Sequence, residues 1–144
     1  MNILIIHGPN LNILGRRDKG LYGELSLNEI NALIKNKAND LDVQLDIIQS
    51  NFEGEIVDRI HRAMDDGTNG IIINPAAFTH YSIAIRDALE PLSIPIIEVH
   101  LSNIYNREDF RRKSVLAPVC TGQITGLGHY GYLLALDMLR IYDD

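Results

Sequence analysis

Short apolar runs alternate along the chain with longer segments whose apolar residues recur every three or four positions. A continuous run such as residues 2–7 is typical of a strand that is buried on both faces. The short runs together predict strands at residues 2–7, 43–49, 70–74, 94–99 and 119–124. The periodic segments are typical of helices with one buried face. They predict helices at residues 27–41, 54–66, 79–89 and 128–142.

Local signals mark several of the boundaries. Ser26 followed by Glu29 matches a capping box at the start of the first helix. Gly67 follows the second helix and is expected to end it. Residues 8–25 are rich in Gly, Asn and Arg and are expected to form a long loop, and residues 100–113 form a polar, charged segment. Long loops in compact domains are usually lids or binding loops.

The alternation of strands and helices predicts the fold class. Parallel strands joined by right-handed helical crossovers form a sheet that is covered by helices on both faces. Five strands predict an α/β, doubly wound, three-layer fold of flavodoxin-like order. The 144 residues suit one domain, spanning residues 1–144. In this architecture ligands bind outside the carboxyl ends of the strands.

Composition excludes several classes of function. The net charge of −6 argues against binding to nucleic acid or to an anionic membrane through the overall charge of the protein. The single cysteine, Cys120, allows no internal disulfide and no Cys-based zinc site. The amino terminus does not match a signal peptide. The uncharged stretch at residues 114–136 is interrupted by Pro118 and several glycines, so a membrane span is not expected. We therefore expect a cytoplasmic protein.

Polar side chains follow the predicted strands and are expected to meet at one edge of the sheet. They include two histidines, several arginines, asparagines and a tyrosine, which together suit a small anion. These residues are Asn10, Arg16, Arg17, Tyr22, Asn74, His80, His100, Ser102, Arg107, Arg111 and Arg112. Two alternatives remain open at this point. Arg16 and Arg17 could simply solvate a loop, and the last three arginines could pair with Glu108 and Asp109 on a surface helix.

Among the histidines, His100 is the strongest candidate for chemistry. It ends a buried strand, and Glu98 lies two residues earlier on the same side of that strand. A carboxylate in this place can orient or charge the imidazole. His7 and His129 are expected to be structural, and His61 is expected to lie on the surface of a helix. The G-x-G-x-x-G pattern at residues 126–131 has too little chain after it for a dinucleotide-binding unit, so it predicts close packing at a helix start.

Several motifs together resemble the type II 3-dehydroquinate dehydratases. They are Gly8-Pro9-Asn10-Leu11-Asn12, Gln49-Ser50-Asn51-Phe52-Glu53-Gly54, Asn74-Pro75-Ala76-Ala77-Phe78-Thr79-His80, Glu98-Val99-His100-Leu101-Ser102-Asn103, Arg107-Glu108 with Phe110-Arg111, and Gly126-Leu127-Gly128 with Gly131-Tyr132. The resemblance runs in register over nearly the whole chain. It implies a lyase that dehydrates 3-dehydroquinate to 3-dehydroshikimate through an enolate, without metal or cofactor, in the shikimate or quinate route. It also implies a homododecamer built as a tetramer of trimers.

The resemblance also implies residue roles. Tyr22 would be the base, with Arg17 beside it favouring the phenolate. His100 would be the acid, and Asn10 would help to hold a water that stabilises the enolate. Substrate-binding residues would be Asn74, His80 and Arg111 for the hydroxyls, Leu101 and Ser102 for the carboxylate, Arg107 for closing the lid, and Asp87 reaching the site of a neighbouring subunit.

Two segments depart from the family pattern. The usual Arg-Glu-Pro of the lid is Arg17-Asp18-Lys19, followed by Gly20, which predicts a more mobile open lid. The usual Gly-Ala-Tyr is Ala76-Ala77-Phe78, which raises the question whether the backbone at Ala76 tolerates a Cβ atom. The altered lid leaves an alternative function, a non-catalytic oligomeric protein that binds the anion. The pairing of a base with an acid argues against it, because binding alone needs neither.

Overall fold

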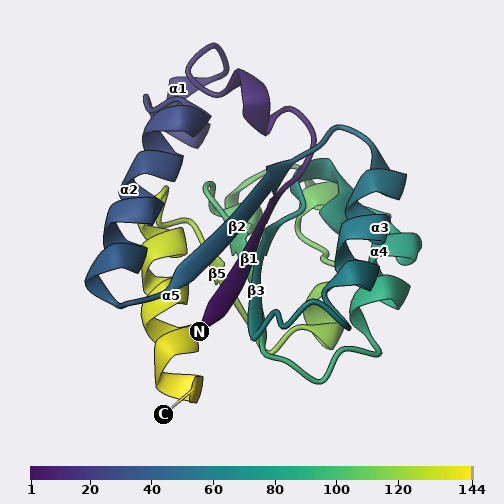
Figure 1. Cartoon of the computed structure of the whole chain (residues 1–144). Helices are drawn as coiled ribbons and strands as arrows, with labels where there is room; N and C mark the ends of the chain where they lie inside the picture. Colours follow the sequence, from purple (N-terminus) through teal and green to yellow (C-terminus); the bar gives the residue numbers. More distant parts are fainter. Residues whose placement is uncertain (144) are drawn as a thin grey trace.

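A five-stranded parallel sheet forms the centre of the computed structural model, which describes residues 1–143 (Figure 1). The strand order is β2-β1-β3-β4-β5, as predicted for a flavodoxin-like fold. The strands are β1 Asn2–His7, β2 Gln44–Gln49, β3 Gly70–Asn74, β4 Ile96–His100 and β5 Gly122–Thr125. The helices are α1 Lys19–Tyr22, α2 Leu27–Asp40, α3 Glu53–Arg62, α4 Ile83–Leu89 and α5 Tyr130–Asp143.

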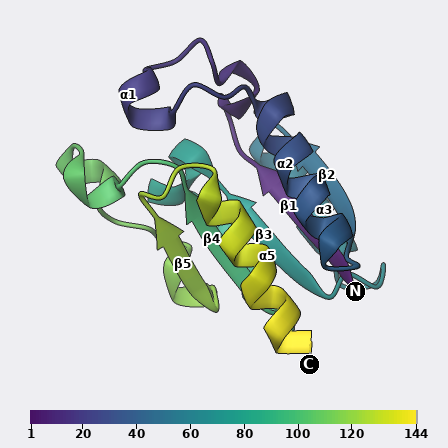
Figure 2. The same ribbon diagram turned by 90° about the vertical axis from the view of Figure 1, so that its left-hand side faces the viewer.

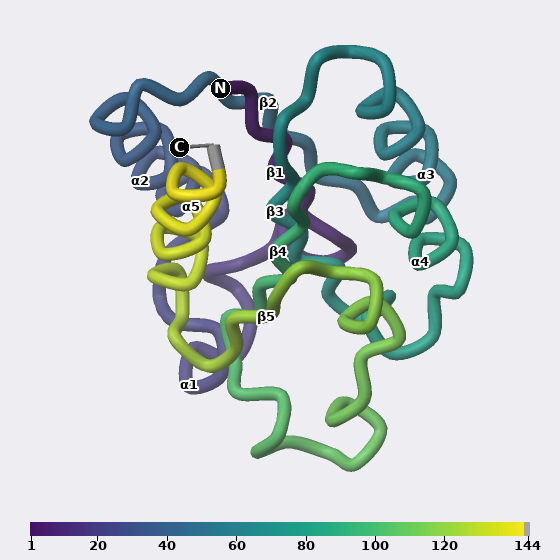
Figure 3. The backbone as a smooth tube through the Cα atoms, turned by 90° about the horizontal axis from the view of Figure 1, so that it is seen from below, coloured from purple at the N-terminus to yellow at the C-terminus, as the bar shows by residue number. Residues whose placement is uncertain are grey.

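The helices form two layers, one on each face of the sheet. Helices α2 and α5 cover one face, and α3 and α4 cover the other (Figure 3). Alternate side chains of a strand point to opposite faces, so Ile3 and Ile5 pack under α2 and α5, whereas Leu4 and Ile6 pack under α3 and α4. This explains why the inner strands β1, β3 and β4 are rich in apolar residues. No helix among residues 1–143 is long and apolar enough to cross a membrane.

The capping box at the start of α2 is confirmed. The Ser26 hydroxyl accepts a hydrogen bond from the Glu29 backbone N–H, and the Glu29 carboxylate accepts one from the Ser26 backbone N–H. The predicted bounds of two other helices were wrong. Helix α3 ends at Arg62, before the predicted end at residue 66. Helix α4 begins at Ile83, because Ser82 caps it by accepting a hydrogen bond from Ile85 N, and Ala76–His80 forms a separate 3-10 helix.

The segment at residues 8–25 contains more regular structure than predicted. It includes a 3-10 helix, Leu11–Ile13, and the one-turn helix α1, whose first turn is capped by the Asp18 carboxylate accepting from Gly20 N at 2.9 Å. This segment extends beyond the carboxyl ends of the strands, while both ends of the chain lie at the opposite edge (Figure 2). Strand β5 also begins later than predicted, because Val119 belongs to a 3-10 helix, Ala117–Val119.

Gly8 brings the chain after β1 into direct contact with the chain after β3. Its backbone N–H donates to Asn74 O at 2.8 Å. A Cβ atom at this position would lie 2.5 Å from Pro75 O and 2.6 Å from Pro75 C, both backbone atoms. Only glycine permits this approach, and the approach places Pro9 and Asn10 beside the segment Asn74–Ala77.

Candidate active site

A pocket lies at the carboxyl edge of the sheet and is built from the segments that follow β1, β3 and β4. It is lined by Pro9, Asn10, Leu11, Arg17, Tyr22, Asn74, Ala76, Ala77, His80, His100, Leu101, Ser102, Ile104, Arg107 and Arg111. Most of these side chains are polar or basic. The lining therefore suits a small, oxygen-rich anion, as the sequence predicted.

Two arginines converge on the hydroxyl of Tyr22. Arg17 Nη2 donates to it at 3.0 Å, and Arg107 Nη2 donates at 2.8 Å. The guanidinium of Arg17 also lies 4.1 Å from the centre of the tyrosine ring. Tyr22 ends helix α1, so the short helix is what turns this side chain toward the strands. Two cations donating to one phenol oxygen stabilise negative charge on that oxygen.

Arg107 links this tyrosine to the segment after β4. Its Nη1 donates to Ser102 Oγ at 3.3 Å. Its Nε is buried, so the side chain is held between lid and sheet rather than solvated. The role of Arg107 as a bridge between Tyr22 and Ser102 was not expected from the sequence, since 85 residues separate it from Tyr22.

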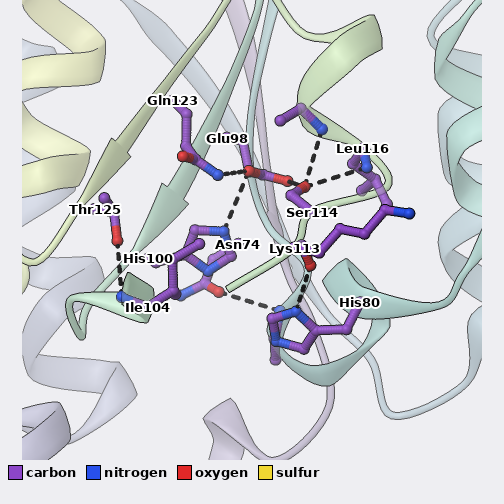
Figure 4. Close-up of polar contacts among 12 residues, drawn as sticks. Asn74, His80, Glu98, His100, Ile104, Lys113, Ser114, Leu116, Gln123 and Thr125 are labelled. Carbon is purple, nitrogen blue, oxygen red and sulfur yellow. Dashed lines mark hydrogen bonds and ion pairs between the residues drawn. The ribbon is translucent and has the colours of Figure 1, made fainter. Parts of the chain in front are cut away.

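A buried carboxylate lies against His100 (Figure 4). Glu98 Oε2 is 3.3 Å from His100 Nε2, and Glu98 is fully buried. The carboxylate accepts hydrogen bonds from Ser114 Oγ at 2.6 Å and from Gln123 Nε2. Burial raises the pKa of Glu98, but the contact with His100 and these hydrogen bonds outweigh it and hold that pKa below its usual value. The predicted pairing of Glu98 with His100 is confirmed.

His80 and Asn74 come from the segment after β3. His80 Nδ1 lies 2.8 Å from the carbonyl oxygen of Lys113, so it carries the proton of a neutral ring and leaves Nε2 as an acceptor. Partial burial lowers the pKa of His80, and the Lys113 carbonyl opposes that shift. Asn74 Oδ1 accepts from Ala76 N at 3.2 Å. On the β1 side, Asn10 adopts a positive φ of 66° and its N–H donates to Asn51 Oδ1 at 2.9 Å.

Ala76 adopts a left-handed backbone conformation, with φ of 51°. This conformation costs an L-residue with a Cβ atom about 1–2 kcal/mol, and glycine adopts it freely. We expect Ala76→Gly to raise the free energy of unfolding by about 1 kcal/mol, measured by urea denaturation. Ala77→Gly is the matched control, because Ala77 has a negative φ and should lose stability on the same change. A fall in stability for both variants would contradict the strain at Ala76.

Ten of the eleven site residues implied by the resemblance line this pocket. The exception is Asp87, which is exposed on α4 and does not line the pocket of its own chain. The two alternatives for the arginines, that they solvate a loop or form ion pairs on a surface helix, each apply to some of them. Arg111 pairs with Glu108, and Arg112 pairs with Asp109 at 3.4 Å, yet Arg111 also lines the pocket. Arg16 is exposed and outside it.

Leu101 was expected in the lining, whereas Leu11 and Ile104 were not identified from the sequence. Leu11 and Ile104 are buried core residues that also line the pocket. The sequence gives no signal that separates an apolar residue of the core from one that also lines a pocket. Of the other histidines, His7 is buried and His61 is exposed on α3. The glycine pattern at residues 126–131 serves close packing, since a Cβ atom on Gly131 would lie 3.1 Å from Val99 Cγ1. Within residues 1–143, no three His, Cys, Asp or Glu side chains are grouped so as to hold a metal ion.

Comparison with known proteins agrees with this geometry. Residues 1–140 match the family model for class II dehydroquinase. The 3-dehydroquinate dehydratase of Caldicellulosiruptor saccharolyticus is 55% identical over 96% of this chain and 95% of its own. The protein of the same name from Thermotoga petrophila is 55% identical over 97% of this chain and 95% of its own.

Solved structures give the same result. The type II dehydroquinase of Butyrivibrio crossotus superposes with a TM-score of 0.95 at 51% identity, covering 96% of this chain and 97% of its own. That of Propionibacterium acnes superposes with a TM-score of 0.94 at 44% identity, covering 97% and 96%. The chain belongs to the class II dehydroquinase family.

Proposed function

We propose that this pocket dehydrates 3-dehydroquinate to 3-dehydroshikimate, with Tyr22 as the base and His100 as the acid. The chain is a hydro-lyase of the class II family. The observation that carries the proposed roles is that one pocket holds a phenol oxygen contacted by two guanidinium groups and an imidazole backed by a buried carboxylate. An elimination needs both a base and an acid acting on one substrate.

Proton removal is the first step. Tyr22, as the phenolate, takes a proton from the carbon next to the ketone, and the electron pair moves onto the ketone oxygen as an enolate. Arg17 and Arg107 stabilise the phenolate through the hydrogen bonds that they donate to its oxygen. The enolate needs a donor where its charge develops, and Asn10 is the residue that would hold a water there.

Loss of the hydroxyl is the second step. The enolate electrons re-form the ketone and the carbon–carbon double bond, and the carbon–oxygen bond of the leaving hydroxyl breaks. His100 gives that oxygen a proton, so it leaves as water. Glu98 supports this role because a buried carboxylate beside the ring stabilises the protonated imidazole.

The remaining residues would position the substrate. Asn74, His80 and Arg111 would bind its hydroxyl groups, Leu101 and Ser102 would hold its carboxylate, and Arg107 would close the lid over it. Asp87 is exposed on α4, which suits the proposal that it reaches the site of a neighbouring subunit. The exposed apolar side chains Tyr81 and Ile83 beside it support an interface there.

The assembly and setting are proposed on the family resemblance. We expect a homododecamer, a tetramer of trimers, acting in the cytoplasm. The same dehydration serves the shikimate route to aromatic amino acids and the quinate route. The membrane and nucleic acid are not expected partners, because the chain is acidic overall.

A direct assay tests the function. Purified protein is mixed with 3-dehydroquinate, and the conjugated enone of the product is followed in the ultraviolet. We expect turnover that is unchanged by chelator, since the proposed groups are all side chains. Binding of 3-dehydroquinate without turnover would instead favour a non-catalytic binding protein and would point to the lid segment Arg17-Asp18-Lys19-Gly20 as the cause. Turnover lost to chelator would overturn the metal-free reaction.

A further inference from the structure

A buried hydrogen-bonded chain runs behind the pocket, on the face of the sheet covered by α2 and α5. His7 ends β1, and Asn74 is its register partner at the end of β3. The Tyr132 hydroxyl lies 2.8 Å from His7 Nδ1, and Asn31 Oδ1 of α2 lies 2.8 Å from His7 Nε2. Burial raises the pKa of Tyr132, and a hydrogen-bonding interaction with the Asn74 side chain opposes that rise. His7, Tyr132 and Asn74 are all at most 3% exposed.

The donor and the acceptor in each of these contacts are inferred from the Asn31 oxygen and from a neutral His7 ring. Asn31 Oδ1 can only accept, so His7 Nε2 carries the ring proton. Burial lowers the pKa of His7 to about 4, so the ring is neutral at pH 7 and Nδ1 is an acceptor. The Tyr132 hydroxyl therefore donates to Nδ1, and its oxygen is left to accept from the amide group of Asn74.

The other side of the Asn74 carboxamide is fixed independently. Its Oδ1 accepts from the backbone N–H of Ala76 at 3.2 Å. An inverted amide would set its NH₂ group against that N–H and its oxygen against the Tyr132 oxygen, two contacts without a hydrogen bond. The chain therefore leaves Asn74 with one N–H and one oxygen lone pair to offer to the pocket, each on a fixed side.

We propose that His7 and Tyr132 are positioning residues that hold the Asn74 carboxamide in the orientation in which it binds a substrate hydroxyl. This inference rests on the proposed function for the role of Asn74. Neither His7 nor Tyr132 lines the pocket, so both act through Asn74 and not on the substrate.

A double-mutant cycle tests the proposal. Tyr132→Phe removes the hydroxyl that fixes the amide, and we expect kcat/KM to fall about three- to tenfold, mostly through a higher KM, the effect of one neutral hydrogen bond. In an Asn74→Ala background the same change should cost less than about twofold, because no amide remains to be oriented. Tyr130→Phe, on the exposed first residue of the same helix, is the matched control and should change neither constant.

Equal losses in the two Asn74 backgrounds would overturn the positioning role while leaving the proposed function intact, which the wild-type turnover tests separately. If Tyr132→Phe does not fold, Asn31→Ala replaces it in the double-mutant cycle, because Asn31 is the half-buried member of the hydrogen-bonded series. The ¹⁵N resonances of the His7 ring give a readout that needs no substrate. We expect a protonated Nε2 and an unprotonated Nδ1, and the opposite tautomer would overturn the proposal.

Discussion

Replacing Tyr22 by phenylalanine should lower kcat by about 10²–10⁴-fold, the usual effect of losing a general base. The change removes the oxygen on which Arg17 and Arg107 converge but keeps the ring over which the Arg17 guanidinium lies. The lid should therefore still pack, and KM should change much less than kcat. Steady-state kinetics with 3-dehydroquinate measure both constants.

The control for this variant is Tyr142→Phe, which removes an exposed hydroxyl near the far end of α5. It should leave kcat unchanged. Circular dichroism should show that both variants are folded. Near-normal turnover by Tyr22→Phe would remove Tyr22 as the base, and the guanidinium groups that now contact it would need another explanation.

Replacing His100 by alanine should have an effect of similar size, about 10²–10⁴-fold on kcat, through loss of the acid. This variant also leaves the fully buried Glu98 without its imidazole neighbour. A buried carboxylate that loses a partner is destabilising, so the variant should unfold at a lower urea concentration. Double replacement with Glu98→Gln should recover part of the stability and none of the activity.

His61→Ala serves as the control, because His61 is exposed on α3. It should match the wild-type rate and stability. An unchanged kcat for His100→Ala would reassign the acid to another group in the pocket.

The inner strands β1, β3 and β4 were predictable because they are buried on both faces and therefore form apolar runs, such as residues 70–74. The ends of helices were less predictable where two short elements follow each other directly. Residues 79–82 are expected to begin the third helix, yet Ser82 caps α4 and separates it from the 3-10 helix Ala76–His80. The one-turn helix α1 depends on a single cap at Asp18 and on contacts of Tyr22 with distant residues, so no local pattern reveals it.

The rim of the site was predictable from topology, because polar residues after parallel strands meet at one edge. The pairing of Glu98 with His100 followed from alternation along one strand. Contacts that join distant segments could not be predicted in this way. Arg107 reaches Tyr22 across the pocket, and Tyr132 reaches His7 across the interior. Tyr132 belongs to the apolar face of α5, where its sequence position indicates only a core residue.

The absence of a side chain at Gly8 has a consequence for exchanging parts between relatives. At Gly8 the loop after β1 lies against backbone atoms of the loop after β3, with no room for an added carbon between them. The backbone conformations of the two loops are therefore matched to each other. A chimera that takes one of these loops from a relative and keeps the other combines two loops whose backbones are not matched. A graft should therefore carry the segments at residues 8–12 and 74–80 together.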